Sequence, residues 1–141
     1  MILGFTGTQS FGPGEVAHLD YCLTDLSDRL VPVQIVTGAC IGVDAYVHHW
    51  YTRHHPVVRR IVVIPSNRTK IDVTVLASAD EVVEMPSGTD YRARNVELVR
   101  RSDTIAAFWT GKTAYSGTFM TMNIAQRMGK IRRENVYGMA L

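Results

Sequence analysis

Residues 33–53, VQIVTGACIGVDAYVHHWYTR, carry the pattern that decides the fold class of this chain. The stretch opens with VQIVTG at 33–38, a short apolar run that ends in glycine. A run of this length with a glycine boundary is typical of a buried strand. The following GVDAYVHHWYTR, residues 42–53, is typical of a helix. Together they predict a strand, a glycine-rich loop and a helix, which is the repeating unit of an α/β fold.

The same order of apolar run, loop and helical pattern recurs along the chain. Strands that are apolar on both faces and separated by helices indicate a parallel sheet covered on each side. The sequence therefore predicts one α/β domain over residues 1–141, doubly wound, with a mainly parallel sheet and helices on both faces. The expected strands cover 1–7, 33–38, 59–65, 81–86, 104–109 and, at a sheet edge, 134–141; the expected helices cover 13–30, 42–53, 73–79, 91–102 and 117–130.

Composition limits the class of protein without choosing a function. The 141 residues carry a formal net charge of +2, which is too small to indicate nucleic acid or a membrane as the main partner. No apolar stretch approaches the length of a membrane span. The two cysteines, Cys22 and Cys40, lie far apart, and we expect reduced thiols in a cytoplasmic protein.

Every expected strand that precedes a helix runs into a loop rich in Gly, Ser, Thr or Asn. In a doubly wound fold these loops meet at the carboxyl edge of the sheet, where ligands bind. Glycine lets the backbone approach a ligand, and hydroxyls and helix N-termini donate to phosphate. Such loops need glycine and caps in any case, but the number that converge here favours a phosphorylated, nucleotide-like ligand. The loop sequences are TGTQSFGPG (6–14), TGACIGVD (37–44), PSNR (65–68), PSGTDYRARN (86–95) and TGKTAYSGT (110–118).

The GKT within residues 110–118 invites comparison with a phosphate-binding P-loop. That motif needs a glycine five residues before the Gly-Lys pair, and position 106 here is alanine. The P-loop interpretation is therefore excluded. A different phosphate site remains, in which Ser116, Gly117 and Thr118 open a helix and present their N–H groups to an anion.

Four segments, in this order and spacing, resemble the SLOG superfamily, which includes relatives of the DNA-processing protein DprA and the "lonely guy" phosphoribohydrolases. The chain is most similar to the small stand-alone members found in bacteria and their phages. The resemblance implies a Rossmann-like fold and a nucleotide or nucleotide-derived ligand. We expect no further cofactor and no metal. The segments are GFTGTQ (4–9), TGACIGVDAYVHH (37–49), RARNVELVRRSDTIAAFW (92–109) and SGTFMTMNIAQRMGK (116–130).

The candidate ligand-binding residues come from the loops and from this resemblance. Arg94 is a candidate phosphate clamp because arginine binds phosphate in a bidentate manner, and Lys112 could close over a ligand. The full set is Thr6, Gly7, Thr8, Gln9, Gly38, Ala39, Gly42, Asp44, Pro65, Arg94, Asn95, Lys112, Ser116, Gly117 and Thr118.

The chain departs from the phosphoribohydrolases at two positions that matter for catalysis. Aligned on Gly117-Thr118, the family's catalytic glutamate falls on Thr121, and the lysine of its Arg-Lys pair falls on Asn95. Threonine cannot supply the carboxylate that stabilises an oxocarbenium-like state. Asp44 is the acid best placed to replace it, and it could also contact a ribose hydroxyl. Its alternative role is structural, because an aspartate in a first helical turn satisfies N–H groups there.

Two other possible sites have weak support. His48, His49, His54 and His55 lie within eight residues, but helical geometry turns neighbours apart and no cysteine or acid completes a metal-ligand set. Cys40 lies in the second glycine loop, where we expect a buried thiol in place of a nucleophile because the sequence fixes no histidine beside it.

The sequence supports three functions in decreasing order. The first is a nucleotide-binding module that acts as a sensor, carrier or sequestering protein. The second is a nucleotide N-glycosidase in which Asp44 is the catalytic acid, so that enzymatic activity stays open. The third, single-stranded DNA binding through the basic segments 53–60 and 130–134, is disfavoured because these lack interleaved aromatic residues. The apolar residues of 119–128 also predict a homodimer or higher homo-oligomer.

Overall fold

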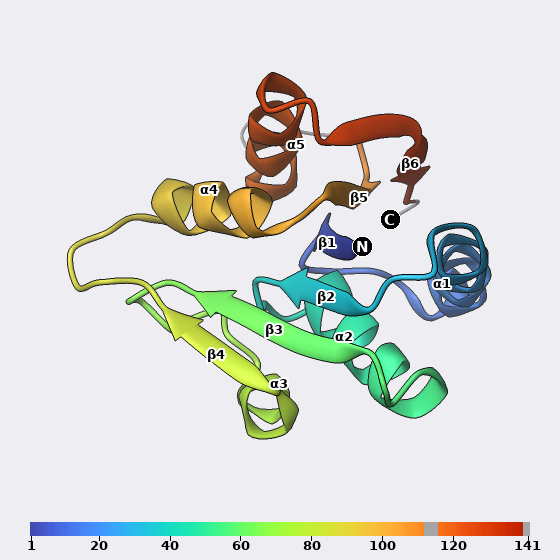
Figure 1. Ribbon diagram of the computed structural model, residues 1–141, viewed down its shortest axis with the longest axis horizontal. Coiled ribbons are helices and arrows are strands. Elements are labelled where there is room, and N and C mark those ends of the chain that lie inside the picture. Colours follow the sequence, from blue (N-terminus) through green and yellow to red (C-terminus); the bar gives the residue numbers. More distant parts are fainter. Residues whose placement is uncertain (112–115, 140–141) are drawn as a thin grey trace.

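A computed structural model describes residues 1–111 and 116–139. Its described residues form a six-stranded sheet with the strand order β4-β3-β2-β1-β5-β6, and each neighbouring pair in this order is parallel (Figure 1). The predicted α/β, Rossmann-like class is confirmed. The strands are β1 (Ile2–Gly7), β2 (Gln34–Thr37), β3 (Arg59–Ile64), β4 (Glu81–Glu84), β5 (Thr104–Trp109) and β6 (Ile131–Gly138).

The helices lie on both faces of the sheet, as a doubly wound fold requires (Figure 1). Side chains of α1, α2 and α3 pack on one face, whereas α4 and α5 cover the other. None of the helices in the described ranges has both the length and the apolar character of a membrane span. The helices are the 3-10 turn η1 (Pro13–Glu15), α1 (Val16–Leu30), α2 (Val43–His54), α3 (Val73–Ser78), α4 (Tyr91–Arg101) and α5 (Gly117–Arg127).

Alternation along the central strands divides the core between the two faces. Phe5 of β1 and Phe108 of β5 point to the α1–α2 face, where their rings stack with centroids 6.5 Å apart. The neighbouring Ile105 of β5 and Val36 of β2 point to the opposite face and pack under α4 and α5. Because both faces are buried, the central strands read as continuous apolar runs in the sequence.

The edge strands differ most from the sequence-based expectation. Residues 134–141 were expected to form an edge strand, and β6 indeed lies at the edge, but it begins at Ile131 and includes a register shift against β5. At the other edge, β4 alternates between half-buried and exposed residues. One-sided burial explains why these strands carry charged residues that weaken the sequence signal.

The order in which strands are added to the sheet reverses between β1 and β5. The chain builds β2, β3 and β4 on one side of β1 and then returns to place β5 and β6 on the other. The loops that leave the carboxyl ends of β1 and β5 must therefore diverge towards opposite faces of the sheet. Such a switch point opens a crevice for ligands in open α/β sheets.

Candidate functional site

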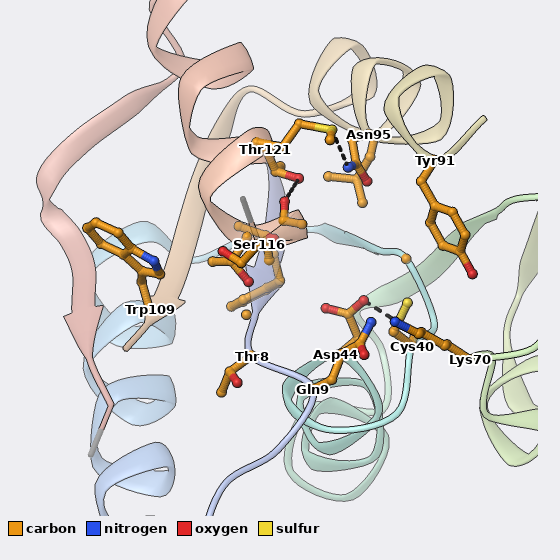
Figure 2. Close-up of a pocket in the computed structure, with 18 of the residues that line it drawn as sticks. Thr8, Gln9, Cys40, Asp44, Lys70, Tyr91, Asn95, Trp109, Ser116 and Thr121 are labelled. Atoms are coloured by element: carbon orange, nitrogen blue, oxygen red, sulfur yellow. Dashed lines mark hydrogen bonds between the residues drawn. The ribbon is translucent and has the colours of Figure 1, made fainter. Parts of the chain in front are cut away.

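A cavity of about 540 Å³ lies at this switch point (Figure 2). Its walls come from the ends of β1, β2 and β5 and from helices α4 and α5. The structure brings most of the predicted ligand-binding residues together here. The predicted residues that line it are Thr6, Gly7, Thr8, Gln9, Gly38, Asp44, Arg94, Asn95, Ser116, Gly117 and Thr118.

The other predicted residues do not line the cavity or cannot be placed. Ala39 and Pro65 are buried and do not line the cavity, and Ala39 adopts a positive φ of 58° in the β2–α2 loop. Gly42 lies three residues further along this loop and does not line the cavity. Lys112 falls outside the described residues.

Gly42 has a structural task that explains its place in the motif. Its φ of 92° favours glycine, and a Cβ there would stand 2.5 Å from the carbonyl carbon of Gln9. The next residue, Val43, donates its N–H to the carbonyl oxygen of Thr8 at 3.0 Å. Gly42 thus lets the first two glycine loops pack backbone against backbone, which fixes the floor of the cavity.

Arg94 occupies the cavity wall as a buried residue that is 6% exposed. Its Nη1 donates to the carbonyl oxygens of Gly38 at 2.8 Å and Val63 at 3.3 Å, and its Nε donates to Asn95 Oδ1 at 2.9 Å. The guanidinium also lies 5.3 Å from the Tyr91 ring centre. All three nitrogens contribute to contacts inside the protein, because Nη2 reaches the Cys40 sulfur at 3.6 Å. Arg94 therefore connects α4 to the end of β2 and to β3, and it places the positive charge of its guanidinium at the cavity wall.

Asp44 is buried in the same wall, with only 7% of the residue exposed. The N–H of Cys40 donates to its Oδ2 at 3.3 Å, and its Oδ1 has no hydrogen-bond partner among the described residues. Burial raises the pKa of this carboxyl from 3.8 to about 6, against the opposing effects of the Arg94 charge and of the Cys40 and Gly38 N–H groups. The bond to Cys40 supports the loop before α2 and is not a cap of the first helical turn. Figure 2 shows the Asp44 carboxylate among the side chains that line the cavity.

The start of α5 forms the wall opposite this loop. Ser116 caps the helix, because its Oγ accepts the N–H of Phe119 at 3.1 Å and its carbonyl oxygen accepts that of Met120 at 3.0 Å. The first N–H groups of any helix lack an intrahelical acceptor, and here they belong to Gly117 and Thr118, which line the cavity. Thr121, in the glutamate's place, donates its hydroxyl to the carbonyl oxygen of Gly117 at 2.9 Å.

Some lining residues were missed by sequence reasoning. Trp109 ends β5, and its Nε1 is buried without a hydrogen-bond partner in the described part of the chain. Lys70 comes to the cavity because the loop after β3 pairs with the β2–α2 loop, where Ile41 N donates to the Lys70 carbonyl oxygen at 3.0 Å. The others are Phe5, Ser10, Cys40, Tyr91, Leu98, Thr110, Met120 and Thr121.

The sequence contains a signal for Trp109, because this residue ends a predicted strand at the carboxyl edge of the sheet, where ligands are expected to bind. Tyr91 likewise opens a helix next to a predicted glycine-containing loop. Lys70 had no local signal, since only the long-range pairing of Cys40 with Ile71 brings it to the site.

The histidine and cysteine alternatives find other roles in the structure. His48 Nε2 shares a hydrogen bond with Ser78 Oγ at 2.8 Å, and His49 Nε2 with Thr74 Oγ1 at 3.0 Å. Over residues 1–111 and 116–139, no three His, Cys, Asp or Glu side chains are grouped to hold a metal ion. Cys40 is a free, buried thiol whose pKa is raised, chiefly by burial, so it lacks the thiolate character of a nucleophile.

Comparison with known proteins finds similar folds among solved structures. No family model matches the sequence, and no curated protein matches it. Among solved structures, the DNA processing protein A of Helicobacter pylori, described with a single-stranded DNA binding mode, superimposes with a TM-score of 0.66 at 20% identity. The match covers 98% of this chain and 68% of that one. The chain has the same fold.

A second structure, the structural genomics target TM1055, superimposes with a TM-score of 0.63 at 19% identity. The match covers 96% of this chain and 76% of TM1055. Both neighbours agree with the fold that the resemblance to the SLOG superfamily implies. At these identities the likeness concerns the fold, and function must be argued from the cavity.

Proposed function

We propose that this protein binds a nucleotide or a nucleotide-derived phosphorylated ligand in the cavity at the β1–β5 switch point. The observation that carries the proposal is the meeting of a helix start, several hydroxyls and a glycine loop around one cavity of about 540 Å³. This volume lies within the range of about 300–1,000 Å³ that is usual for small-molecule sites.

The start of α5 supports a site for the phosphate. The Gly117 and Thr118 N–H groups carry the partial positive charge of the helix end, and anions bind favourably there. Hydroxyls of Thr6 and Thr8 come from the end of β1 and from the loop that follows it. Lys70 adds a cation at the edge of the cavity. These donors suit an anion with several oxygen acceptors, which is the chemistry of a phosphate group.

The remaining walls suit a flat organic group. Trp109 and Tyr91 lie on different sides of the cavity in Figure 2, and Leu98, Met120 and Phe5 add apolar surface. Aromatic side chains stack on nucleobases because every base has a π-face. A cavity with donors at one helix start and aromatic residues in its walls therefore fits a nucleotide better than a free inorganic anion.

Mass spectrometry of small molecules released from the purified, denatured protein tests this proposal directly. Calorimetric titration with ribonucleoside 5′-monophosphates should also give saturable binding at one site per chain. The proposal would be contradicted if no nucleotide-like compound were released and no heat of binding were measured at millimolar nucleotide.

A second candidate function is N-glycosidic bond cleavage. Of the cavity-lining residues that the structure describes, Asp44 alone carries a carboxylate, and a pKa of about 6 suits acid–base work near neutral pH. Thr121 carries a hydroxyl group and cannot act as the missing carboxylate. Chromatography of free base from nucleoside monophosphates over many turnovers would favour this candidate, particularly if Asp44→Asn abolished release but not binding.

Single-stranded DNA binding is a property of the Helicobacter neighbour, and here it is a weaker candidate. The basic segments 53–60 and 130–134 lie where β3 and β6 begin, at the sheet edge opposite the cavity. Arg59 and Arg60 there already form ion pairs with Glu81 and Asp80. Oligonucleotide binding that weakens steeply with salt would raise this candidate.

A further inference from the structure

We infer that Asp44 selects ribonucleotides over deoxyribonucleotides by accepting a hydrogen bond from a ribose hydroxyl at its Oδ1. This inference rests on the proposed nucleotide site and names the class of nucleotide that the site prefers. Asp44 would be a specificity-determining residue, because it would contact the sugar of the bound nucleotide.

The geometry around the carboxylate carries the inference. Only 7% of Asp44 is exposed, yet its Oδ1 lacks a hydrogen-bond partner among residues 1–111 and 116–139. Its other oxygen is fixed by the Cys40 N–H at 3.3 Å, so the carboxylate cannot turn without losing that bond. Buried polar atoms are nearly always hydrogen-bonded in folded proteins. An acceptor held in this way at a cavity wall calls for a donor that occupies the cavity.

The chemistry of a carboxylate limits what that donor can be. An ionised aspartate only accepts hydrogen bonds, and it repels a phosphate. The phosphate therefore belongs at the α5 start, away from Asp44. In Figure 2 the Asp44 side chain lies between Trp109 on one side of the cavity and Tyr91 on the other. A ribose, which joins the phosphate to the base, offers hydroxyl donors to such an intermediate position.

The ionisation of Asp44 makes the preference dependent on pH. The ionisable groups that face it are Arg94 from α4 and the Cys40 thiol of its own loop, with Lys70 at the adjoining loop. Burial places the pKa of Asp44 near 6. The ionised carboxylate is the stronger acceptor, so the preference for ribose should grow between pH 5 and pH 8.

Calorimetry with matched nucleotides tests the inference. The four ribonucleoside 5′-monophosphates are titrated into the full chain beside their 2′-deoxy and 3′-deoxy counterparts. The wild-type protein should bind at least one ribonucleotide about 10- to 100-fold more tightly than a counterpart that lacks the contacted hydroxyl, since hydrogen bonds to charged groups have this magnitude. Phosphate ionisation is shared within each pair and cancels in the ratio.

Two variants separate the role of Asp44 from that of a carboxylate in general. Asp44→Asn should reduce the preference to about threefold or less, because it presents a neutral amide. Asp90→Asn is the matched control: Asp90 caps α4 through the Ala93 N–H, lies outside the cavity lining, and asparagine caps helices equally well. This control should keep the full preference.

The outcomes distinguish this inference from the proposed function. Equal affinity of the wild-type protein for ribonucleotides and both deoxy series would overturn the role of Asp44 and leave the nucleotide site standing. An absence of binding by every nucleotide would overturn both. If Asp44→Asn fails to fold, the pH dependence of the wild-type preference tests the role of Asp44: growth between pH 5 and pH 8 supports it, and a preference that does not change with pH overturns it.

Discussion

Arg94 Nη1 donates to the carbonyl oxygen of Gly38 at 2.8 Å, in a space that leaves no room for a side chain at residue 38. A Cβ there would stand 2.5 Å from Arg94 Nη1 and 3.0 Å from Asp44 Oδ2. Glycine at the end of β2 therefore allows the cation of α4 and the carboxylate of α2 to approach the same backbone. The cavity wall depends on this close packing.

Gly38→Ala should destabilise the protein because the buried Arg94 cannot move aside without losing its carbonyl acceptors. We expect a loss of about 1–3 kcal/mol in the free energy of unfolding, as is usual for overpacked sites. Gly14→Ala is the control, since a Cβ at residue 14 meets nothing within 4 Å. Chemical denaturation checks this, and equal stability of the two variants would show that the wall tolerates a methyl group.

Asp44→Asn should stabilise the free protein while it impairs the site. The folded-state pKa of about 6 lies above the reference value of 3.8, so the ionised carboxylate costs stability as pH rises through this window. The variant should gain up to about 3 kcal/mol at pH 8 and almost nothing at pH 4. Thermal unfolding across pH measures this. A variant less stable than wild type at pH 8 would mean that the charge supports the fold.

His48 should make stability fall in mild acid. It is fully buried, and burial lowers its pKa from 6.5 to about 4. Between pH 6.5 and pH 4 the unfolded chain binds a proton at His48 that the folded protein does not bind. The free energy of unfolding should therefore drop by about 3 kcal/mol as pH falls from 6.5 to 4.

Asp44 acts in the opposite direction over part of this range, so the pH dependence of His48 is best measured in the Asp44→Asn background. Adding His48→Gln, which keeps a polar group near Ser78, should flatten the slope between pH 6.5 and 4. An unchanged slope would assign the pH dependence to other groups.

We also propose that the surface of α5 pairs with a second copy of the chain. Ile124 is buried in the core, but Phe119 and Met122 line a second hollow of about 290 Å³ against Ile131 and Val136 of β6. Met122→Glu should weaken a dimer by more than about tenfold, because a charge would be buried without a partner. Tyr21→Glu, on exposed α1 surface, is the control. Sedimentation velocity that finds only monomer at high micromolar wild-type protein would exclude the dimer.

The sequence predicted the order of elements because each element is locally encoded. Glycine boundaries and apolar runs marked β1, β2 and β5, and Ser116 marked the start of α5 through its capping preference. Asp44 and Gly117 also emerged from their loops, since parallel strands bring such loops to one edge.

The details of the site depend on contacts between distant residues, which no local pattern records. The role of Arg94 as a phosphate clamp stays a prediction, whereas the contacts of its nitrogens with Gly38, Val63, Asn95 and Cys40 could not be predicted. Lys70 reaches the cavity only through the pairing of its loop with the β2–α2 loop. That Asp44 Oδ1 is buried without a partner in the described part of the chain is likewise visible only in the folded structure.

The helix start at Gly117 allows the most direct test of the nucleotide site. A Cβ at residue 117 meets nothing within 4 Å, and an acidic residue in the first turn of a helix is favourable, so Gly117→Asp should fold at least as stably as wild type. The carboxylate would occupy the position proposed for the phosphate. Val73→Asp, at the exposed start of α3 and outside the cavity lining, makes the same change of charge as a control.

The decisive measurement is the calorimetric dissociation constant of ribonucleoside 5′-monophosphates for these three proteins at one ionic strength. Repulsion between like charges in a confined site predicts an affinity about 100-fold weaker or worse for Gly117→Asp, with wild-type affinity in Val73→Asp. Unchanged affinity in a folded Gly117→Asp variant would contradict a phosphate site at the start of α5, and with it the central claim.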